Sequence, residues 1–299
     1  MNGLESGAGP RHVPVLSAEV LNALAVTPGQ VVVDATVGAG GHSRLLAERV
    51  APSGRLIGLD QDAAMLDLAR PRLQALPVTL VQANFDRLRD VLDEQGVKKV
   101  DAVLADLGFC SDQLDDPERG LSFNLPGPLD MRLDPTRGEP ASVLLKRLSE
   151  RDLANLVFQY GEERFSRRIA RKIVEVRKRS PLRTTEQLAD LVRGCVPRPK
   201  GQRHPLDPAT RTFQALRIAV NDELGALDRL LAALPECVKP GGQAAIISFH
   251  SLEDRRVKQA FRDRSTWENL TRKPIQASEE EVRNNPRARS AKLRAAVRV

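Results

Sequence analysis

The sequence predicts an α/β fold, a doubly wound parallel sheet interrupted by an inserted all-helical domain. Strand and helix signals alternate with short loops through the first third of the chain, which is typical of a parallel sheet. From about residue 111 to residue 212 the strand signals stop and helical runs take their place, and the alternation then resumes. We therefore expect two core segments, 1–112 and 213–299, around a helical insert over 113–212.

The first core segment carries four predicted strands, separated by helical runs. Three of these strands end at an aspartate, namely Asp34, Asp60 and Asp106. Runs of β-branched and apolar residues mark the strands, and amphipathic spacing marks the helices. The strands are expected at 31–34, 54–60, 78–85 and 100–106, and the helices at 42–51, 62–76 and 85–96.

The insert reads as a series of amphipathic helices. Ser149 with Asp152, and Thr184 with Gln187, have the spacing of helix-starting capping boxes. The run 162–179 places Phe165, Ile169, Ile173 and Val176 on one face with arginines opposite. The predicted helices are 141–149, 149–161, 162–179 and 184–196.

The second core segment starts with a helical stretch over 213–238. A turn follows at "KPGG" (239–242), and then a strand at 243–249. The tail is expected to be loop in its middle and to end in a strand or hairpin over 291–299.

Composition favours a folded, soluble, cytoplasmic protein. Of 299 residues, 28% are charged and 41% hydrophobic, and no segment approaches the ~18 apolar residues of a membrane span. Residues 1–14 lack the apolar core of a signal peptide. The three cysteines form no CxxC pair, so we expect reduced thiols, with no disulfide framework and no metal site.

Positive charge is concentrated in two parts of the chain. The net charge is +7, yet residues 164–203 hold thirteen Lys and Arg against three acidic residues, and residues 282–299 hold six against none. Such clusters are typical of a protein that binds a polyanion, and equally of a solvated helix face and a tail. Charge alone leaves both interpretations open.

The loop in "VVVDATVGAGGHS" (31–43) suggests a ligand at the end of the first strand. Gly38 and Gly40 keep the first spacing of a dinucleotide fingerprint, but Ser43 stands where its third glycine belongs, which counts against NAD. A phosphate-binding loop would need a Lys-Ser/Thr pair that is absent here. S-adenosyl-L-methionine is the alternative, because its ribose hydroxyls suit an acid such as Asp60.

Two further strand ends support such a pocket. Phe85 would offer an apolar face to the adenine, and Asp106 would point into the crevice where open α/β sheets bind ligands. Each residue alone has a structural explanation, as a turn, a cap or a core side chain. Their succession along three strand ends favours a ligand pocket.

Eight segments together resemble the RsmH (also called MraW) family, the 16S rRNA cytosine N(4)-methyltransferases. They cover nearly the whole chain in order, the insert included. The segments are "HVPVL" (12–16), "VDATVGAGGHS" (33–43), "DLGFCSDQLDDPERGLSF" (106–123), "GPLDMRLD" (127–134), "YGEERFSRRIA" (160–170), "TRTFQALRIAVNDEL" (210–224), "PGGQAAIISFHSLEDRRVK" (240–258) and "NPRARSAKLR" (285–294).

The resemblance implies a class I, S-adenosyl-L-methionine-dependent methyltransferase core with an insert that recognises the ribosomal substrate. It implies methyl transfer to the N(4) amine of a cytidine in the decoding region of 16S rRNA in the small ribosomal subunit. No membrane and no obligatory metal are implied, and a homodimer stays open. The implied cofactor-binding residues are Gly40, Gly41, His42, Asp60, Phe85, Asp106 and Gln113.

Candidates for catalysis are Asp106, Asp130 and His250, with no general base assigned. The alternatives are a loop salt bridge of Asp130 with Arg132 and a satisfied strand-end position for His250. Phosphate contacts are expected from Arg167, Arg168, Arg171 and Lys172.

The chain departs from the family at Phe109 and Cys110, where "DLGFCS" replaces the usual "DLGVSS". We take Cys110 as a packed small residue, because no Pro-Cys context supports a nucleophile.

Two rival functions share parts of the pattern. A nucleotide-cofactor oxidoreductase gives no reason for the basic insert, and a non-catalytic rRNA-binding factor predicts no cofactor affinity.

Overall fold

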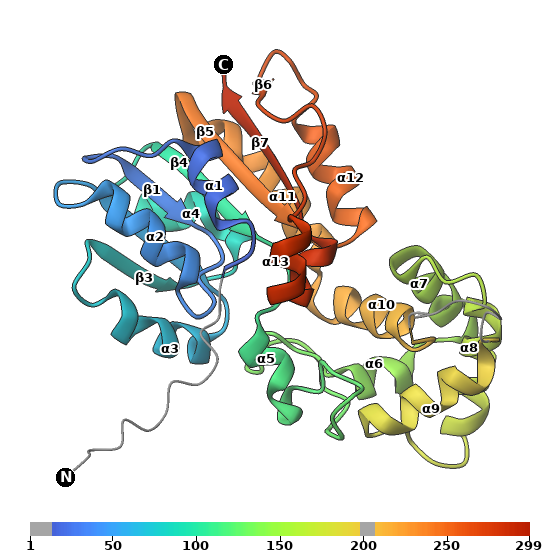
Figure 1. The fold of residues 1–299 in the computed structure, drawn as a ribbon. Coiled ribbons are helices and arrows are strands. Elements are labelled where there is room, and N and C mark those ends of the chain that lie inside the picture. The colour runs from blue at the N-terminus through green and yellow to red at the C-terminus, as the bar shows by residue number, and fades with distance from the viewer. Residues whose placement is uncertain (1–13, 198–206) are drawn as a thin grey trace, which may run out of the picture. The chain divides into compact units, whose positions relative to one another are not determined.

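The computed structural model describes residues 14–197 and 207–299, which form two compact units (Figure 1). The sheet unit runs up to Leu107 and resumes at Leu230, and the helical unit is Gly108–Arg229. The segment 113–212 lies wholly inside the helical unit. The second boundary falls within helix α11 (Glu223–Cys237).

The sheet unit contains one seven-stranded sheet in the order β3-β2-β1-β4-β5-β7-β6. The first five strands are parallel, as expected, and β7 runs antiparallel to both β5 and β6 at the edge. The strand expected near the chain end is therefore confirmed. The strands are β1 Val31–Asp34, β2 Arg55–Asp60, β3 Val78–Gln82, β4 Val100–Asp106, β5 Val238–Ser248, β6 Trp267–Asn269 and β7 Lys292–Arg298.

Helices bury both faces of the central strands. Along β4, Ala102 and Leu104 belong to a core cluster with α1 and α2, while the alternate residues Val103 and Ala105 are equally buried on the other side. Burial on both faces explains why these strands read as nearly continuous apolar runs. The helices of this unit are α1 Ser17–Leu24, α2 Gly41–Val50, α3 Ala63–Leu73, α4 Leu88–Glu94, α12 Ser251–Ala260 and α13 Glu279–Asn284.

The expected turn at 239–242 was wrong, because these residues form the first part of β5. The pairing of β5 with β4 shifts register between Val100 and Ala102. Gly241 adopts φ 78°, a value that glycine tolerates. The backbone therefore bends at this irregularity, and the residues on both sides still belong to β5.

Two other expectations also need correction. β3 ends at Gln82, and Phe85 begins a 3-10 turn that the Asn84 side chain caps. The middle of the tail is not all loop, because α13 forms there with Ser278 as its N-cap. Ser278 followed by Glu281 is a helix-starting pattern that the sequence contained.

The helical unit packs its helices around a core of its own. Within the described residues it has no strand, as expected, and both Ser149 and Thr184 cap their helices as proposed. Ile169 and Ile173 are buried in this core on the face opposite the arginines. The helices are α5 Ser111–Asp115, α6 Ala141–Arg147, α7 Glu150–Gly161, α8 Ser166–Arg177, α9 Thr185–Cys195 and α10 Thr210–Asn221.

Candidate active site

Three aspartates end neighbouring parallel strands at one edge of the sheet. Asp34 ends β1, Asp60 ends β2 and Asp106 ends β4, and the strand register brings the three ends together. Ligands of open α/β sheets bind outside this carboxyl edge. The structure therefore confirms the strand-end positions of Asp34, Asp60 and Asp106.

The glycine loop is shaped by packing as well as by backbone angle. Gly40 adopts φ 85° at the N-cap of α2, and a Cβ there would lie 3.2 Å from the Cβ of Ala69. A Cβ on Gly41 would lie 3.2 Å from Pro14. Both glycines thus let helix α2 start close against its neighbours at the carboxyl edge.

Asp60 ties the glycine loop to the end of β2. Its Oδ2 accepts the N–H of Gly38 at 2.8 Å, and its Oδ1 accepts the N–H of Asp62 at 2.9 Å. Burial raises the pKa of Asp60 to about 6, against the opposing effect of these two hydrogen bonds. Each carboxylate oxygen keeps a lone pair, which suits a pair of ribose hydroxyls.

Asp34 accepts hydrogen bonds from two residues of the segment that contains the glycine loop. The Oγ of Ser43 donates to Asp34 at 2.6 Å, and the N–H of Thr36 donates to it at 3.1 Å. Burial raises the pKa of Asp34, with the Ser43 hydrogen bond acting against it. Sequence reasoning did not assign these roles, although an aspartate two residues before a threonine is a known turn signal.

Asp106 combines a fixed backbone with a buried carboxyl group. Its N–H donates to the Oγ1 of Thr36 at 2.6 Å, and its Oδ2 lies 3.7 Å from the Nε2 of His42 in the first turn of α2. Its Oδ1 is buried and has no hydrogen-bond partner among the described residues. Burial, followed by the charges of Asp34 and Glu253, raises the pKa of Asp106 to about 8.

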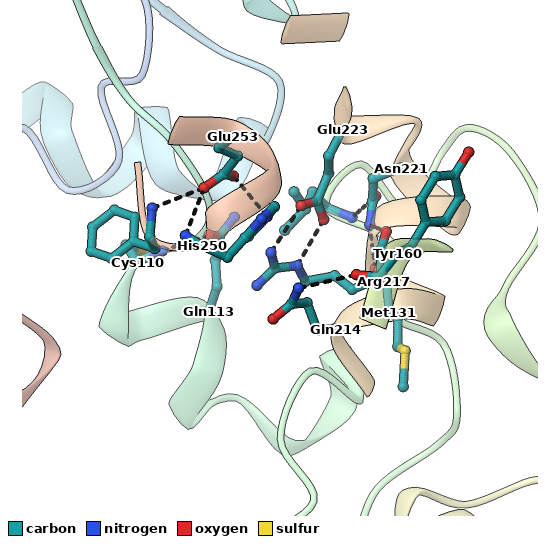
Figure 2. A network of polar contacts seen from close by, with 12 residues as sticks. Cys110, Gln113, Met131, Tyr160, Gln214, Arg217, Asn221, Glu223, His250 and Glu253 are labelled. Atoms are coloured by element: carbon teal, nitrogen blue, oxygen red, sulfur yellow. Dashed lines mark hydrogen bonds and ion pairs between the residues drawn. The ribbon is translucent and has the colours of Figure 1, made fainter. Parts of the chain in front are cut away.

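His250 lies after β5 and serves as the N-cap of α12, so its expected place at the strand end needs a correction of two residues. Glu253 orients this turn, since its Oε2 accepts the N–H groups of Phe249 at 2.8 Å and His250 at 3.2 Å (Figure 2). Its Oε1 lies 3.2 Å from the Nε2 of His250. Glu253 is a buried acid that sequence reasoning did not single out.

Of the predicted cofactor-binding and catalytic residues, Gln113 and Asp130 belong to the helical unit. Gln113 is buried in α5, and its Oε1 accepts the N–H of Cys110 at 3.0 Å (Figure 2). Asp130 receives two hydrogen bonds of 2.8 Å from the guanidinium of Arg132, the loop salt bridge that was the alternative to catalysis. Phe109, one of the two departures from the family pattern, packs under the guanidinium of Arg217 at 4.6 Å from the ring centre.

The Asp130 loop is held by an amide from α10. Asn221 donates its side-chain N–H to the carbonyl of Met131 and accepts the N–H of Leu133, both at 2.8 Å (Figure 2). Met131 is fully buried and adopts φ 68°, a conformation that a non-glycine residue holds only when its surroundings impose it. Asn221 is a site-supporting residue that the sequence did not reveal.

The four expected RNA-binding residues all lie on the exposed side of α8. Arg171 lies 3.6 Å from Glu150, and Lys172 lies 3.2 Å from Glu175. Arg167 and Arg168 make no ion pair within the described part of the chain. The basic residues Arg198, Lys200 and Arg203 lie outside the described residues, as does the N-terminal stretch 1–13.

Comparison with known proteins decides the family. The model of the MraW methylase family matches residues 9–299. The chain belongs to that family. It is 52% identical to ribosomal RNA small subunit methyltransferase H of Sorangium cellulosum (strain So ce56), over 97% of this chain and 92% of that protein. The protein of the same name from Synechococcus sp. (strain WH7803) is 52% identical over 96% of this chain and 94% of its own length. The one from Symbiobacterium thermophilum is 46% identical over 96% of this chain and 96% of its own length.

As a member of the MraW methylase family, the chain is an S-adenosyl-L-methionine-dependent methyltransferase. The carboxyl edge fits this cofactor, because Asp60 offers acceptors beside the glycine loop and Asp106 has an unsatisfied buried oxygen. All three cysteines are free thiols, and none of the described helices is long and apolar enough to cross a membrane.

Proposed function

We propose that this chain transfers a methyl group from S-adenosyl-L-methionine to the N(4) amine of a cytidine in the decoding region of 16S rRNA. The names of its relatives support the small-subunit rRNA as the substrate. The near-complete series of family motifs supports cytidine N(4) as the acceptor. The observation that carries the proposal is the carboxyl edge itself, where Asp60 and the glycine loop are joined beside Asp106.

In this proposal the cofactor-binding residues belong to the sheet unit, except for Gln113 of the helical unit. Asp60 would accept the ribose hydroxyls, the loop at Gly40 and Gly41 would pass beside the amino-acid end, and Phe85 would cover the adenine. His42, Asp106 and Gln113 complete the proposed set. The cofactor supplies an electrophilic methyl group on a positively charged sulfur.

The chain's main contribution to the reaction would be positioning. The N(4) amine is conjugated with the cytosine ring and is a weak nucleophile, so it must be held in line with the methyl group. Such positioning is worth up to roughly 7–11 kcal/mol in favourable intramolecular models. A strong base is not required, because the methylated amine is acidic.

Asp106 is the best placed of the three catalytic candidates to hold a proton. Its pKa of about 8 keeps the carboxyl protonated at neutral pH in the ligand-free protein, and Oδ1 has no competing partner among the described residues. Asp106 would accept a hydrogen bond from the amine when ionised and donate one to the base when protonated. Asp130 would be a further hydrogen-bond acceptor for the amine, and His250 would contact the flipped base.

The helical unit would recognise the RNA. A stacked cytidine must leave its stack at a cost of a few kcal/mol, and phosphate contacts help to offset that cost. The exposed cations Arg167, Arg168, Arg171 and Lys172 on α8 are suited to phosphate contacts, which fix register without reading sequence.

The test is methyl transfer from labelled S-adenosyl-L-methionine to small ribosomal subunits that lack the modification, followed by nucleoside analysis. We expect N(4)-methylated cytidine from the native chain and none from Asp60→Ala. The exposed Asp67→Ala serves as the matched control and should behave like the native chain. Cofactor binding without transfer would show that the substrate is wrong, and loss of both would favour the non-catalytic factor.

A further inference from the structure

A basic concavity lies within the sheet unit, among residues that belong to no part of helix α8. The cavity has a volume of about 690 Å³ and is formed by the end of α12, the segment that leads through β6, and β7. Its cationic lining residues are Lys258, Arg262, Arg264, Arg272 and Arg294. Nothing in the sequence analysis assigned a role to the first four.

Four of these five cations have no partner in the described part of the chain. Lys258, Arg262, Arg264 and Arg272 are exposed, and their side chains make no hydrogen bond or ion pair with any described residue. Arg294 is different, because it is buried and its guanidinium donates to Asp254 at 2.7 Å. The cavity therefore gathers four cationic side chains that make no hydrogen bond or ion pair with the described residues.

Two nearby acidic residues already have other partners. Asp254 already pairs with Arg294 and lies 3.9 Å from the Nζ of Lys292. Asp263, between two of the arginines in sequence, accepts from the hydroxyls of Ser265 at 2.6 Å and Thr266 at 2.7 Å. Glu268 is the only acidic side chain among the residues that line the cavity.

Some cations elsewhere in the same unit are paired with an acidic residue of their own helix. Arg44 lies 2.8 Å from Glu48 in α2, and Arg89 lies 2.6 Å from Asp93 in α4. Surface pairing of this kind is the ordinary state of a solvated helix. What distinguishes the cavity is that five cationic side chains line one hollow.

The cavity is suited to a polyanion that is recognised through its phosphates. Trp267 lines it but is only 3% exposed, with its ring packed 5.3 Å from that of Phe261. Its face is therefore not available for stacking against a base, as single-stranded nucleic-acid sites usually require. Flexible, exposed Lys and Arg side chains bind phosphates without reading the bases.

Helix α12 connects this cavity to the active-site edge. The helix begins at Ser251, directly after its N-cap His250, and Lys258 follows seven residues later. At 1.5 Å per residue this is about 11 Å along the helix axis. An RNA strand that delivers a base to the carboxyl edge could therefore place flanking phosphates at the cavity.

We propose that this cavity binds the phosphodiester backbone of the RNA substrate, as a second contact on the sheet unit that is independent of α8. The inference rests on the proposed function, because the RNA is the one whose cytidine is methylated. It names Lys258, Arg262, Arg264 and Arg272 as phosphate-binding residues.

The test compares two full-length variants of equal charge change. One is Lys258→Gln/Arg262→Gln/Arg272→Gln. The control, Arg70→Gln/Lys98→Gln/Lys99→Gln, removes three exposed cations elsewhere in the sheet unit. Steady-state methylation of small ribosomal subunits is measured from low to moderate salt, together with the affinity for S-adenosyl-L-methionine.

We expect the cavity variant to raise KM for the subunits about tenfold with kcat and cofactor affinity unchanged. The slope of log affinity against log salt should fall by about two, since each single-strand phosphate contact contributes roughly 0.7. The control should match the native chain. Equal KM and equal salt slopes in both variants would overturn the inference.

Trp267 provides a direct readout, because it is the only tryptophan of the chain. Titration with a short single-stranded RNA should change its fluorescence in the native chain and in the control, but not in the cavity variant. An equal response to inorganic phosphate at the same concentration would mean a site for free anions and would also overturn the inference. If the native chain methylates no subunits at all, the proposed function fails. The fluorescence titration does not depend on methyl transfer, so it tests RNA binding at the cavity separately.

Discussion

Gly38 donates its backbone N–H to the carboxylate of Asp60 across 2.8 Å, so the loop after β1 is attached to the end of β2. The same carboxylate accepts from Asp62, which caps helix α3. One side chain therefore sets the positions of two loops at the carboxyl edge. Its ionisation state is expected to control how well this edge binds a ligand.

Cofactor affinity should depend on pH through Asp60. Its pKa of about 6 means that the carboxylate becomes protonated below this pH and loses acceptor capacity. We expect the Kd for S-adenosyl-L-methionine to rise as pH falls from 7 to 5, measured by calorimetry. Asp60→Asn should bind about 2 kcal/mol more weakly, roughly thirtyfold, and with a flatter pH profile in this range. A native profile that is flat from pH 7 to 5 would contradict this role.

Asp106 should make the ligand-free protein less stable as pH rises. Its pKa is about 8 in the folded state and near 4 in the unfolded chain, so the folded state binds the extra proton between these values. The free energy of unfolding should then decrease with pH by up to about 1.4 kcal/mol per unit from this group, and level off above pH 8.

Urea unfolding of the native chain and of Asp106→Asn at several pH values measures this effect. The asparagine variant should gain stability over the native chain as pH rises from 5 to 8, while it loses methyl transfer. A constant difference between the two proteins across this range would show that Asp106 is ionised throughout.

Gly40→Ala should destabilise the protein by about 1–3 kcal/mol, because the residue has φ 85° and its new Cβ would press on Ala69. Gly194 offers a matched control within helix α9, where a Cβ meets nothing within 4 Å. Gly194→Ala should stabilise the protein by about 0.5–1 kcal/mol. Thermal unfolding of both variants should therefore shift in opposite directions, and a shift in the same direction would contradict the argument.

Asn221→Ala should loosen the loop that carries Asp130. It removes the partners of two backbone groups, at Met131 and Leu133, each worth about 1–3 kcal/mol when left unsatisfied in the interior. We expect lower stability to urea and a lower kcat with unchanged cofactor affinity. Asn124→Ala, at an exposed position of the same unit, is the control. An unchanged kcat would separate this loop from catalysis.

Neutralising Arg167, Arg168 and Arg171 together should weaken use of ribosomal subunits while cofactor affinity is kept. Arg171 contacts Glu150, and exposed pairs of this kind contribute little to stability. KM for subunits and the cofactor Kd should be measured side by side. Loss of both would indicate a folding defect instead of a lost RNA contact.

Much of the fold was predictable from the sequence, because several strands are short apolar runs and three of them end at aspartates. Phe85 was misplaced because "QANF" continues the apolar pattern, whereas Asn84 turns the chain by accepting the N–H of Asp86. Gly241 was read as a turn because a glycine pair does not distinguish a turn from a kinked strand. Local patterns show where single elements end, but not how two strands pair.

The site was less predictable, because its supporting contacts join distant parts of the chain. Thr36 holds the backbone of Asp106 from seventy positions away, and Asn221 holds Leu133 from eighty-eight. No spacing rule along one sequence indicates such pairs. Asp34 was a partial exception, since its neighbours in the turn do carry a local signal.

The insert delays closure of the sheet during synthesis. Leu104 in β4 pairs with Ala245 in β5, and all the residues of the helical unit lie between them in the chain. Until β5 emerges from the ribosome, β4 is an edge strand that lacks its partner on one side and carries apolar residues on both faces. Such edges recruit other strands and promote aggregation. The placement of the insert therefore makes truncated or slowly completed chains of this protein especially prone to misassembly.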